Sequence, residues 1–148
     1  MTRWEGPDGY TVDDDPSRLD LGFIHHWLST ESYWAQGRPL EVTERAVRAS
    51  LNLGLYDRDG AQAGFCRWVT DQATFGWLCD VFVDGAHRGH QLGVFLVRCA
   101  VEHPAVRELR CVLGTKDAHE LYRRFGFNEL LAPERFMEIP RPGHAPPA

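Results

Sequence analysis

The spacing of apolar and polar positions predicts both helices and strands along this chain of 148 residues. Apolar residues that recur every three or four positions indicate helices, and short apolar runs bounded by turn residues indicate strands. Counting N-caps, helices are predicted at 20–29, 40–51, 91–102 and 117–125, and strands at 10–14, 53–56, 63–69, 74–83, 109–113 and 135–139.

Turn signals predict how these elements connect. The run Asp57-Arg58-Asp59-Gly60 indicates a hairpin, because Asp-Gly is favoured in tight turns between strands. The helix at 91–102 lies between two strands, so it is the crossover of a parallel pair. The predicted fold is α/β, with a mixed, mostly antiparallel central sheet flanked by about four helices. We expect one domain over residues 1–139, and a disordered, proline-rich tail at 140–148.

Composition and charge argue against several classes of partner. Hydrophobic residues make up 43% of the chain and charged residues 25%, which is typical of a globular domain. The net charge of −5 argues against nucleic acid, and no apolar run is long enough to cross a membrane. The beginning of the chain lacks the apolar core of a signal peptide, so a cytoplasmic location is expected. The four cysteines are expected to be buried thiols.

The most informative stretch runs from Asp80 to Gly93. A β-branched and aromatic strand ends in a glycine-bearing turn, and a helix follows directly. Free backbone N–H groups at a helix N-terminus converge on one point and favour an anion, and Arg88 adds a positive charge there. An ordinary strand-to-helix connection has the same local pattern, so both interpretations stay open on this stretch alone.

Two motifs and the element order resemble the GNAT superfamily of acyl-CoA-dependent N-acetyltransferases. The acyl-CoA loop of that family reads Arg/Gln-x-x-Gly-x-Gly/Ala, and this chain has Arg88-Gly89-His90-Gln91-Leu92-Gly93. The late helix of the family carries Ala-x-x-Leu-Tyr with Gly-Phe shortly after it, and this chain has Ala118-His119-Glu120-Leu121-Tyr122 and Gly126-Phe127. The resemblance covers about Tyr10 to Ile139.

The resemblance implies a GNAT-like sheet with acetyl-CoA as cosubstrate. The pantetheine arm would lie along Val81, Phe82 and Val83, where this strand separates from 109–113. The pyrophosphate would be held by the backbone amides of Arg88, Gly89, His90, Gln91, Leu92 and Gly93.

Three positions depart from the family pattern. Gln91 replaces the middle glycine of the loop, which is costly if the position needs a positive φ. Thr115 stands where the family often has an asparagine that contacts the cofactor. His90 brings a titratable ring to the loop.

Acetyl transfer to an amine needs a neutral amine, a donor for the developing oxyanion, and an acid for the thiolate. The resemblance makes Tyr122 the expected acid, because tyrosine with a pKa of ~10 stays protonated at neutral pH. From periodicity alone, Tyr122 is a packed core aromatic. Asp80 is the candidate base, since burial would raise the pKa of its carboxyl. Alternatively, its carboxylate faces outward or accepts structural hydrogen bonds. His25 and His26 are rivals, of which at most one faces a pocket.

The loop at 30–39 is the candidate wall of the acceptor site. Tyr33 and Trp34 suit a small-molecule pocket, where they would pack on the substrate or on its ammonium. Alternatively, they are buried aromatics that pin the loop. His87 and His90 have the spacing of metal ligands, but no third ligand is evident, so no metal is expected.

The function that follows is transfer of an acetyl group from acetyl-CoA to a primary amine of a small molecule, with a homodimer allowed. Gln91 and Thr115 leave open a non-catalytic acyl-CoA-binding or sensing domain. A dinucleotide-binding domain is rejected, because no Gly-x-Gly-x-x-Gly run follows an early strand.

Overall fold

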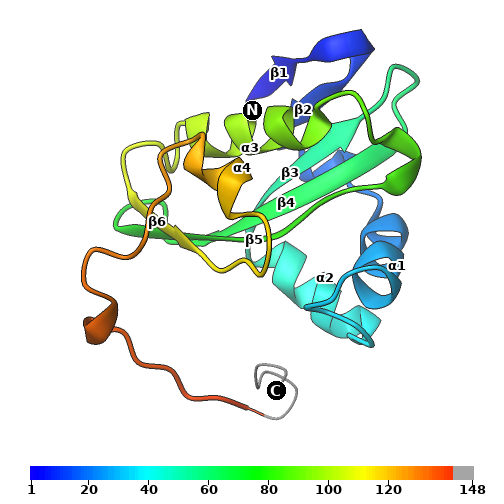
Figure 1. Cartoon of the computed structure of the whole chain (residues 1–148). Coiled ribbons are helices and arrows are strands. Elements are labelled where there is room, and N and C mark those ends of the chain that lie inside the picture. Colours follow the sequence, from blue (N-terminus) through cyan, green and yellow to red (C-terminus); the bar gives the residue numbers. More distant parts are fainter. Residues whose placement is uncertain (142–148) are drawn as a thin grey trace.

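A six-stranded sheet forms the centre of the molecule, which a computed structural model describes over residues 1–141 (Figure 1). The strands lie side by side in chain order, antiparallel from β1 to β5, with β6 parallel to β5. The predicted mixed, mostly antiparallel sheet is therefore confirmed. The strands are β1 Arg3–Glu5, β2 Thr11–Asp13, β3 Leu51–Tyr56, β4 Gln62–Thr70, β5 Phe75–Val83 and β6 Arg110–Leu113.

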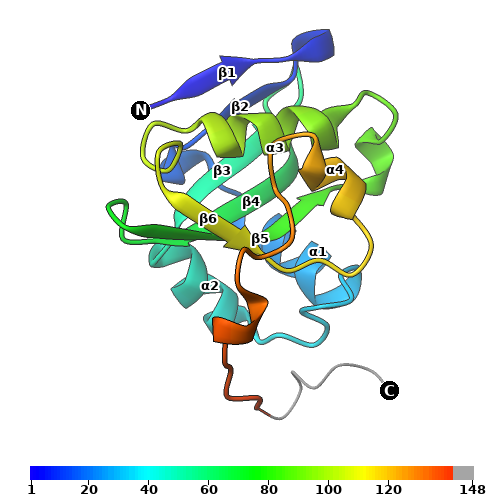
Figure 2. The same cartoon turned by 60° about the vertical axis from the view of Figure 1, so that its left-hand side comes forward.

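Helices cover both faces of this sheet. On one face lie α1 (Leu21–Thr30) and α2 (Leu40–Arg48), and on the other lie α3 (Leu92–Glu102) and α4 (His119–Arg123) (Figures 1 and 2). The Asp20 side chain caps α1 by accepting from the Phe23 amide at 3.0 Å, as its sequence position predicts. No helix within residues 1–141 is long and apolar enough to cross a membrane.

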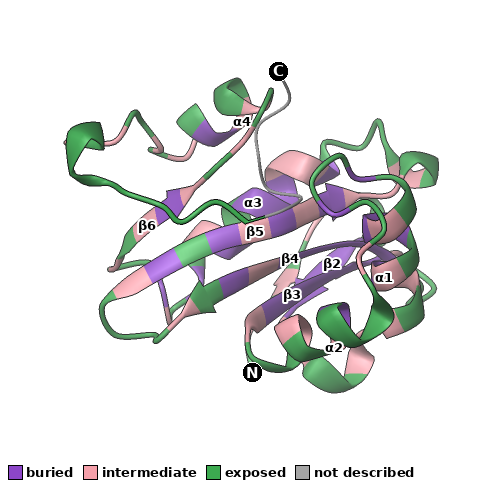
Figure 3. Ribbon diagram, turned by 90° about the horizontal axis from the view of Figure 1, so that it is seen from below, coloured by how far each residue is buried: buried purple, intermediate pink, exposed green. Residues whose placement is uncertain are grey.

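The sheet separates two apolar cores, because successive side chains of a strand point to opposite faces. The larger core lies under α3, where the Trp68 indole donates to the Ala100 carbonyl at 3.1 Å. The smaller core lies under α1, where the Trp27 ring stacks on Phe82 with centroids 4.2 Å apart. Figure 3 shows the buried positions following the strands between these helices.

A β-bulge interrupts β5 at Asp80. Phe65 of β4 pairs with Phe82, but Arg67 pairs with Cys79, so two residues of β5 oppose one residue of β4. Asp80 takes up the extra length with a φ of 53°, in the left-handed region. The bulge changes which β5 side chains face α1 and which face α3, and so turns Asp80 towards the α1 side together with Phe82.

Several predicted boundaries were wrong for physical reasons. Residues 135–139 form no strand, because a 3₁₀ turn at Pro133–Arg135 precedes them and no neighbouring strand pairs with them in the described chain. The second helix ends at Arg48 instead of reaching residue 51, because β3 already begins at Leu51. Strand β1 was missed, since its three residues carry too short a pattern.

Asp117 does not cap α4, because the N-cap position is Ala118 and no side-chain cap bond forms among the described residues. The Thr115 hydroxyl accepts from the Ala118 amide at 3.1 Å. Gly126 does follow this helix with a φ of 94°, as predicted. Of the tail predicted to be disordered, Pro140 and Arg141 are exposed coil, and 142–148 lie outside the described residues.

Candidate acetyl-transfer site

A cavity opens where β5 and β6 separate. The last residues paired between these two strands are Leu78 and Leu113, and β5 continues for five residues beyond that point. The cavity has a volume of about 690 Å³ and is walled by β5, by the segment after β6, and by the loop between α1 and α2. Of the residues predicted for the site, it is lined by Tyr33, Trp34, Asp80, Val81, Thr115 and Tyr122.

Within residues 1–141, the β5 backbone past Leu78 has no strand partner on the β6 side, so its polar groups can bond an extended ligand. Of the three residues predicted to hold the pantetheine arm, Val81 lines the cavity directly. The Phe82 side chain is buried against Trp27, and Val83 packs against the larger core. These two positions can therefore offer the ligand only their backbone.

The predicted anion loop has the expected conformation. A 3₁₀ turn at Gly85–His87 leads to Arg88, Gly89 has a φ of 100°, and α3 begins after Gln91. Among the described residues no side chain caps this helix, so its first-turn N–H groups, among them those of Leu92 and Gly93, are left free at its N-terminus. Such a loop can bind a phosphate group.

Two contacts tie this loop to the hairpin of β1 and β2. The Tyr10 hydroxyl lies 2.8 Å from Nδ1 of His87, and a carboxylate oxygen of Asp8 lies 3.0 Å from Nδ1 of His90. The His90 ring, left without a role by the motif, therefore positions the loop against a neighbouring element.

Tyr122 is nine-tenths buried, and it lines the cavity from α4. Burial raises the pKa of its phenol to about 12. Its ring packs edge-on against Phe127, with centroids 5.9 Å apart. No hydrogen bond from residues 1–141 engages its hydroxyl, whereas a tyrosine that serves only as core usually has a satisfied hydroxyl.

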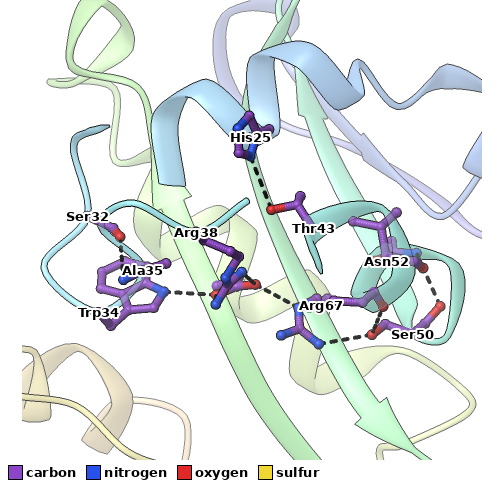
Figure 4. Close-up of polar contacts among 12 residues, drawn as sticks. His25, Ser32, Trp34, Ala35, Arg38, Thr43, Ser50, Asn52 and Arg67 are labelled. Atoms are coloured by element: carbon purple, nitrogen blue, oxygen red, sulfur yellow. Dashed lines mark hydrogen bonds and ion pairs between the residues drawn. The ribbon is translucent and has the colours of Figure 1, made fainter. Parts of the chain in front are cut away.

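Asp80 lies at the centre of a largely buried ion cluster with Arg38 and Arg67. Figure 4 shows Trp34, Arg38 and Arg67 directed towards one shared acceptor. The carboxylate of Asp80 accepts from Nη1 of Arg38 at 2.9 Å, from Nε of Arg67 at 2.7 Å and from the Trp34 indole at 2.8 Å. Burial raises the pKa of this carboxyl, but the Arg38 hydrogen bond and the Arg67 charge outweigh that effect and leave the pKa lowered. The expectation of a raised pKa was therefore wrong.

The two arginines of this cluster were missed in the sequence. Arg67 interrupts the apolar strand β4 as Asp80 interrupts β5, and two opposite charges in neighbouring buried strands are a signal of pairing. Arg38 carried no such signal, because it comes from a loop whose path depends on the whole fold.

The loop between α1 and α2 reaches across the mouth of the cavity. The Lys116 backbone amide donates to the Tyr33 hydroxyl at 3.0 Å, and the Lys116 ammonium lies 5.4 Å from the centre of that ring. Trp34 is held by Asp80, and Ser32 is anchored in the core by bonds to Leu28 and Ala35. The loop is thus fixed at both ends of its aromatic pair.

The rival histidines lie away from this cavity. Nδ1 of His25 lies 3.3 Å from the Thr43 hydroxyl, between α1 and α2, and His26 is exposed. No group of three or more potential metal-binding side chains occurs in the described part of the chain. All four cysteines are free, with Cys66 and Cys99 buried and Cys79 and Cys111 half-buried.

A profile of the acetyltransferase (GNAT) domain family matches residues 51–129, which span β3 to the end of the α4 region. The chain belongs to the GNAT acetyltransferase family. The match includes both motifs that carried the resemblance, and it includes Asp80 and Tyr122.

Known relatives of this GNAT chain agree with that assignment. A structure from Xanthomonas campestris pv. campestris, described provisionally as a GNAT acetyltransferase, is 42% identical, covers 90% of this chain and 94% of its own, and superposes with a TM-score of 0.86. A curated protein of Gibberella zeae, named provisionally as an acetyltransferase, is 29% identical over 76% of this chain and 75% of its own. A Clostridium acetobutylicum structure described with acetyl-CoA shares the fold, with 11% identity, a TM-score of 0.63, and coverage of 88% of this chain and 94% of its own.

Replacing Gln91 with glycine is expected to relieve strain at this position. Either the loop then binds an anion more tightly, or the free energy of unfolding rises slightly. Gln91 has a φ of 58°, a conformation that costs a non-glycine residue about 1 kcal/mol and that glycine adopts freely. The glycine variant also gains entropy in the unfolded state, so the net change in stability is expected to stay below about 1 kcal/mol. Thermal unfolding with and without acetyl-CoA measures both effects. Gln91→Ala is the control, because it keeps the strain, and a glycine variant that is weaker than the alanine variant in both respects would contradict the prediction.

Proposed function

We propose that this GNAT chain transfers an acetyl group from acetyl-CoA to a primary amine of a small molecule. The observation that carries the proposal is Tyr122, which lines the cavity between β5 and β6 and whose hydroxyl has no hydrogen-bond partner within residues 1–141. The free amides at the start of α3 and the unpaired β5 backbone supply the neighbouring binding groups for the pyrophosphate and the pantetheine arm.

Tyr122 serves as the acid of the reaction. Because burial keeps its pKa near 12, the phenol is protonated at any physiological pH and can donate towards the sulfur atom as the C–S bond breaks. The new C–N bond forms at the carbonyl carbon, and the proton lost by the attacking nitrogen balances the proton gained by the thiol. In this proposal, a backbone N–H of β5 near Val81, beyond the last residue paired with β6, stabilises the oxygen of the reacting carbonyl.

Asp80 orders the acceptor wall in this proposal. Its lowered pKa and its three donors make the carboxylate a weak base, but they hold Trp34 and the loop carrying Tyr33 in place. The cluster of two guanidinium groups and one carboxylate carries a net positive charge. Such a charge disfavours a bound ammonium ion, so it favours the neutral amine that must attack.

A direct transfer is favoured over a covalent enzyme intermediate. The cysteine that lines the cavity is Cys79, and burial raises the pKa of its thiol to about 11. The thiolate is the nucleophilic form of cysteine, and little of it is present at neutral pH when the pKa is that high.

Acetyl-CoA is expected to raise the melting temperature, whereas NAD is expected to leave it unchanged. At a hundred times its dissociation constant, a ligand that binds only the folded state adds about 2.7 kcal/mol, which corresponds to roughly 5–10 °C for a chain of this size. Thermal unfolding at millimolar ligand measures the shift. No shift with acetyl-CoA, and no heat of binding by calorimetry, would rule out the cofactor.

The acceptor is tested by release of free thiol from acetyl-CoA with a panel of amines, polyamines, amino acids and aminoglycosides. We expect at least one class of primary amine to raise thiol release well above the rate without acceptor. Binding of acetyl-CoA without thiol release from any acceptor would instead support the acyl-CoA-binding or sensing domain.

A further inference from the structure

The ion cluster of Asp80, Arg38 and Arg67 holds one more positive than negative charge. The side chain of Asp80 is 2% exposed, that of Arg67 13% and that of Arg38 19%, so the excess charge is largely withdrawn from water. No second carboxylate within residues 1–141 forms an ion pair with either arginine. Because a poorly hydrated charge without a counter-charge is costly, the ion cluster attracts one further negative charge.

Both guanidinium groups keep donors that the described chain does not use. Arg67 donates from Nε to Asp80 at 2.7 Å and from Nη1 to the Ser50 hydroxyl at 3.1 Å. Arg38 donates from Nη1 and Nη2 to Asp80, at 2.9 and 3.5 Å. Within residues 1–141, Nη2 of Arg67 and Nε of Arg38 make no hydrogen bond, and in Figure 4 the free nitrogen of Arg67 points away from Ser50. Such donors match the oxygens of a carboxylate.

The ion cluster adjoins the cavity between β5 and β6. Asp80 lines that cavity, and so does Trp34, which donates to the same carboxylate. Arg67 pairs with Cys79 across strands β4 and β5, and Cys79 also lines the cavity. Side chains at paired positions share one face of a sheet, with Cβ atoms about 5 Å apart. The guanidinium groups therefore lie directly behind the cavity wall, within reach of a ligand.

The segment after β6 adds a further positive charge to the same cavity. Lys116 lines the cavity, and its ammonium lies 5.4 Å from the centre of the Tyr33 ring. The neighbouring Asp117 also lines the cavity, but it is exposed, so water screens its charge. Together with the ion cluster, three positive and two negative side chains surround the cavity, which again leaves one positive charge in excess.

We propose that the acceptor is an amine that also carries a carboxylate, as an amino acid does, and that the ion cluster binds this carboxylate. The inference rests on the proposed function and names the class of its acceptor. One excess positive charge matches the single charge of a carboxylate better than the double charge of a phosphate ester. The carboxylate supplies the missing counter-charge and leaves the amine end of the molecule free to react.

The length of the cavity agrees with a short acceptor. It follows β5 from Trp77 to Val81, and Tyr122 also lines it. An amine that reacts beside Val81 and a carboxylate held beside Cys79 are separated by two strand residues, or about 7 Å. An amino acid spans this separation together with its hydrogen bonds. The aromatic rings that line the cavity can pack on its side chain.

Thiol release from acetyl-CoA with matched acceptors tests the preference. The sets are phenylalanine with phenylalaninamide and phenethylamine, and β-alanine with its amide and propylamine. The carboxylate of each set is expected to have a kcat/KM at least about tenfold above that of its amide. The amide has the less basic amine, so it would react faster if the carboxylate had no part in binding. A preference for O-phosphoethanolamine over β-alanine would contradict the charge count.

Variants of Arg38 show whether the ion cluster is the cause. Arg38→Gln leaves Asp80 and Arg67 as a neutral pair, so the kcat/KM of the carboxylate relative to its amide is expected to fall to about one. Arg38→Lys keeps the charge and is expected to keep most of the preference. Arg48→Gln is the matched control, because Arg48 is exposed on α2, and it is expected to keep the wild-type ratio. General damage to the fold slows both acceptors and leaves the ratio unchanged.

Binding measured by NMR in the presence of CoA separates this inference from the proposed function. Phenylalanine is expected to bind the wild-type chain at least about tenfold more tightly than phenylalaninamide, and to lose this advantage in Arg38→Gln. That result without thiol release from any acceptor would remove the proposed function and keep the carboxylate site. Equal binding or no binding of the two compounds, or a preference that Arg38→Gln leaves unchanged, would overturn the inference.

Discussion

Replacing Asp80 with asparagine is expected to lower the free energy of unfolding by about 2–3 kcal/mol at neutral pH, and the melting temperature by roughly 5–10 °C. The substitution keeps the size of the side chain but removes the charge that faces Arg38 and Arg67. Two largely buried guanidinium groups would then lack a counter-charge. Removing one partner of a buried ion pair usually costs more than the pair itself contributes.

The dependence of this loss on pH follows from the lowered pKa of Asp80. A carboxyl whose pKa is lower in the folded state stabilises the fold above its unfolded pKa of about 3.9, and this contribution disappears as the pH falls through the folded value. The difference in the free energy of unfolding between wild type and Asp80→Asn is therefore expected to be constant from pH 7 to 5 and to become smaller below about pH 4. Denaturant titrations at each pH measure it.

Asp59→Asn is the matched control, because Asp59 is an exposed residue of the hairpin turn and forms no ion pair within residues 1–141. It is expected to change stability by less than about 0.5 kcal/mol. An Asp80→Asn variant as stable as this control would show that the ion cluster contributes nothing to the fold. A variant of wild-type stability that loses only turnover would instead restore Asp80 as the base.

Replacing Tyr122 with phenylalanine is expected to lower kcat by about tenfold or more, with little change in the affinity for acetyl-CoA. The phenylalanine ring can keep the contact with Phe127 and the burial of the site. The loss is that of the proton donor alone. Steady-state kinetics with the best amine of the panel, together with calorimetric binding of acetyl-CoA, separates the two quantities.

Tyr56→Phe provides the control for this second variant. The Tyr56 hydroxyl is buried in β3 without a hydrogen-bond partner in the described chain, and it does not line the cavity. Its removal is expected to leave kcat unchanged and to leave stability unchanged or slightly raised. If kcat is the same in Tyr122→Phe as in wild type, Tyr122 is a core aromatic and some other group donates to the sulfur.

The local pattern of apolar, polar and turn residues was sufficient to predict most of the fold. Asp20 caps α1, the Asp-Gly turn joins β3 to β4, and Gly126 ends the α4 region, because each of these features depends on neighbours within a few residues. The anion loop and the parallel pair of β5 and β6 followed from the same local reasoning combined with the motif. The motif raised the question whether the position of Gln91 needs a positive φ. The structure answers it, because Gln91 adopts the left-handed conformation, and the resulting strain can be measured.

Local sequence was enough for the order of elements and for the loop before α3, because caps, turns and periodicity act over a few residues. Tyr122 was selected as the candidate acid through the family resemblance, since periodicity alone makes it a core aromatic. Tertiary structure alone decided the state of Asp80. Its charge depends on Arg67, 13 positions away, which meets it through the pairing of β4 with β5. It also depends on Arg38, 42 positions away, which meets it only when the α1–α2 loop folds over the bulge in β5. Tertiary structure also decided that residues 135–139 are not a strand, because they follow the 3₁₀ turn at Pro133–Arg135 and pair with no strand within residues 1–141.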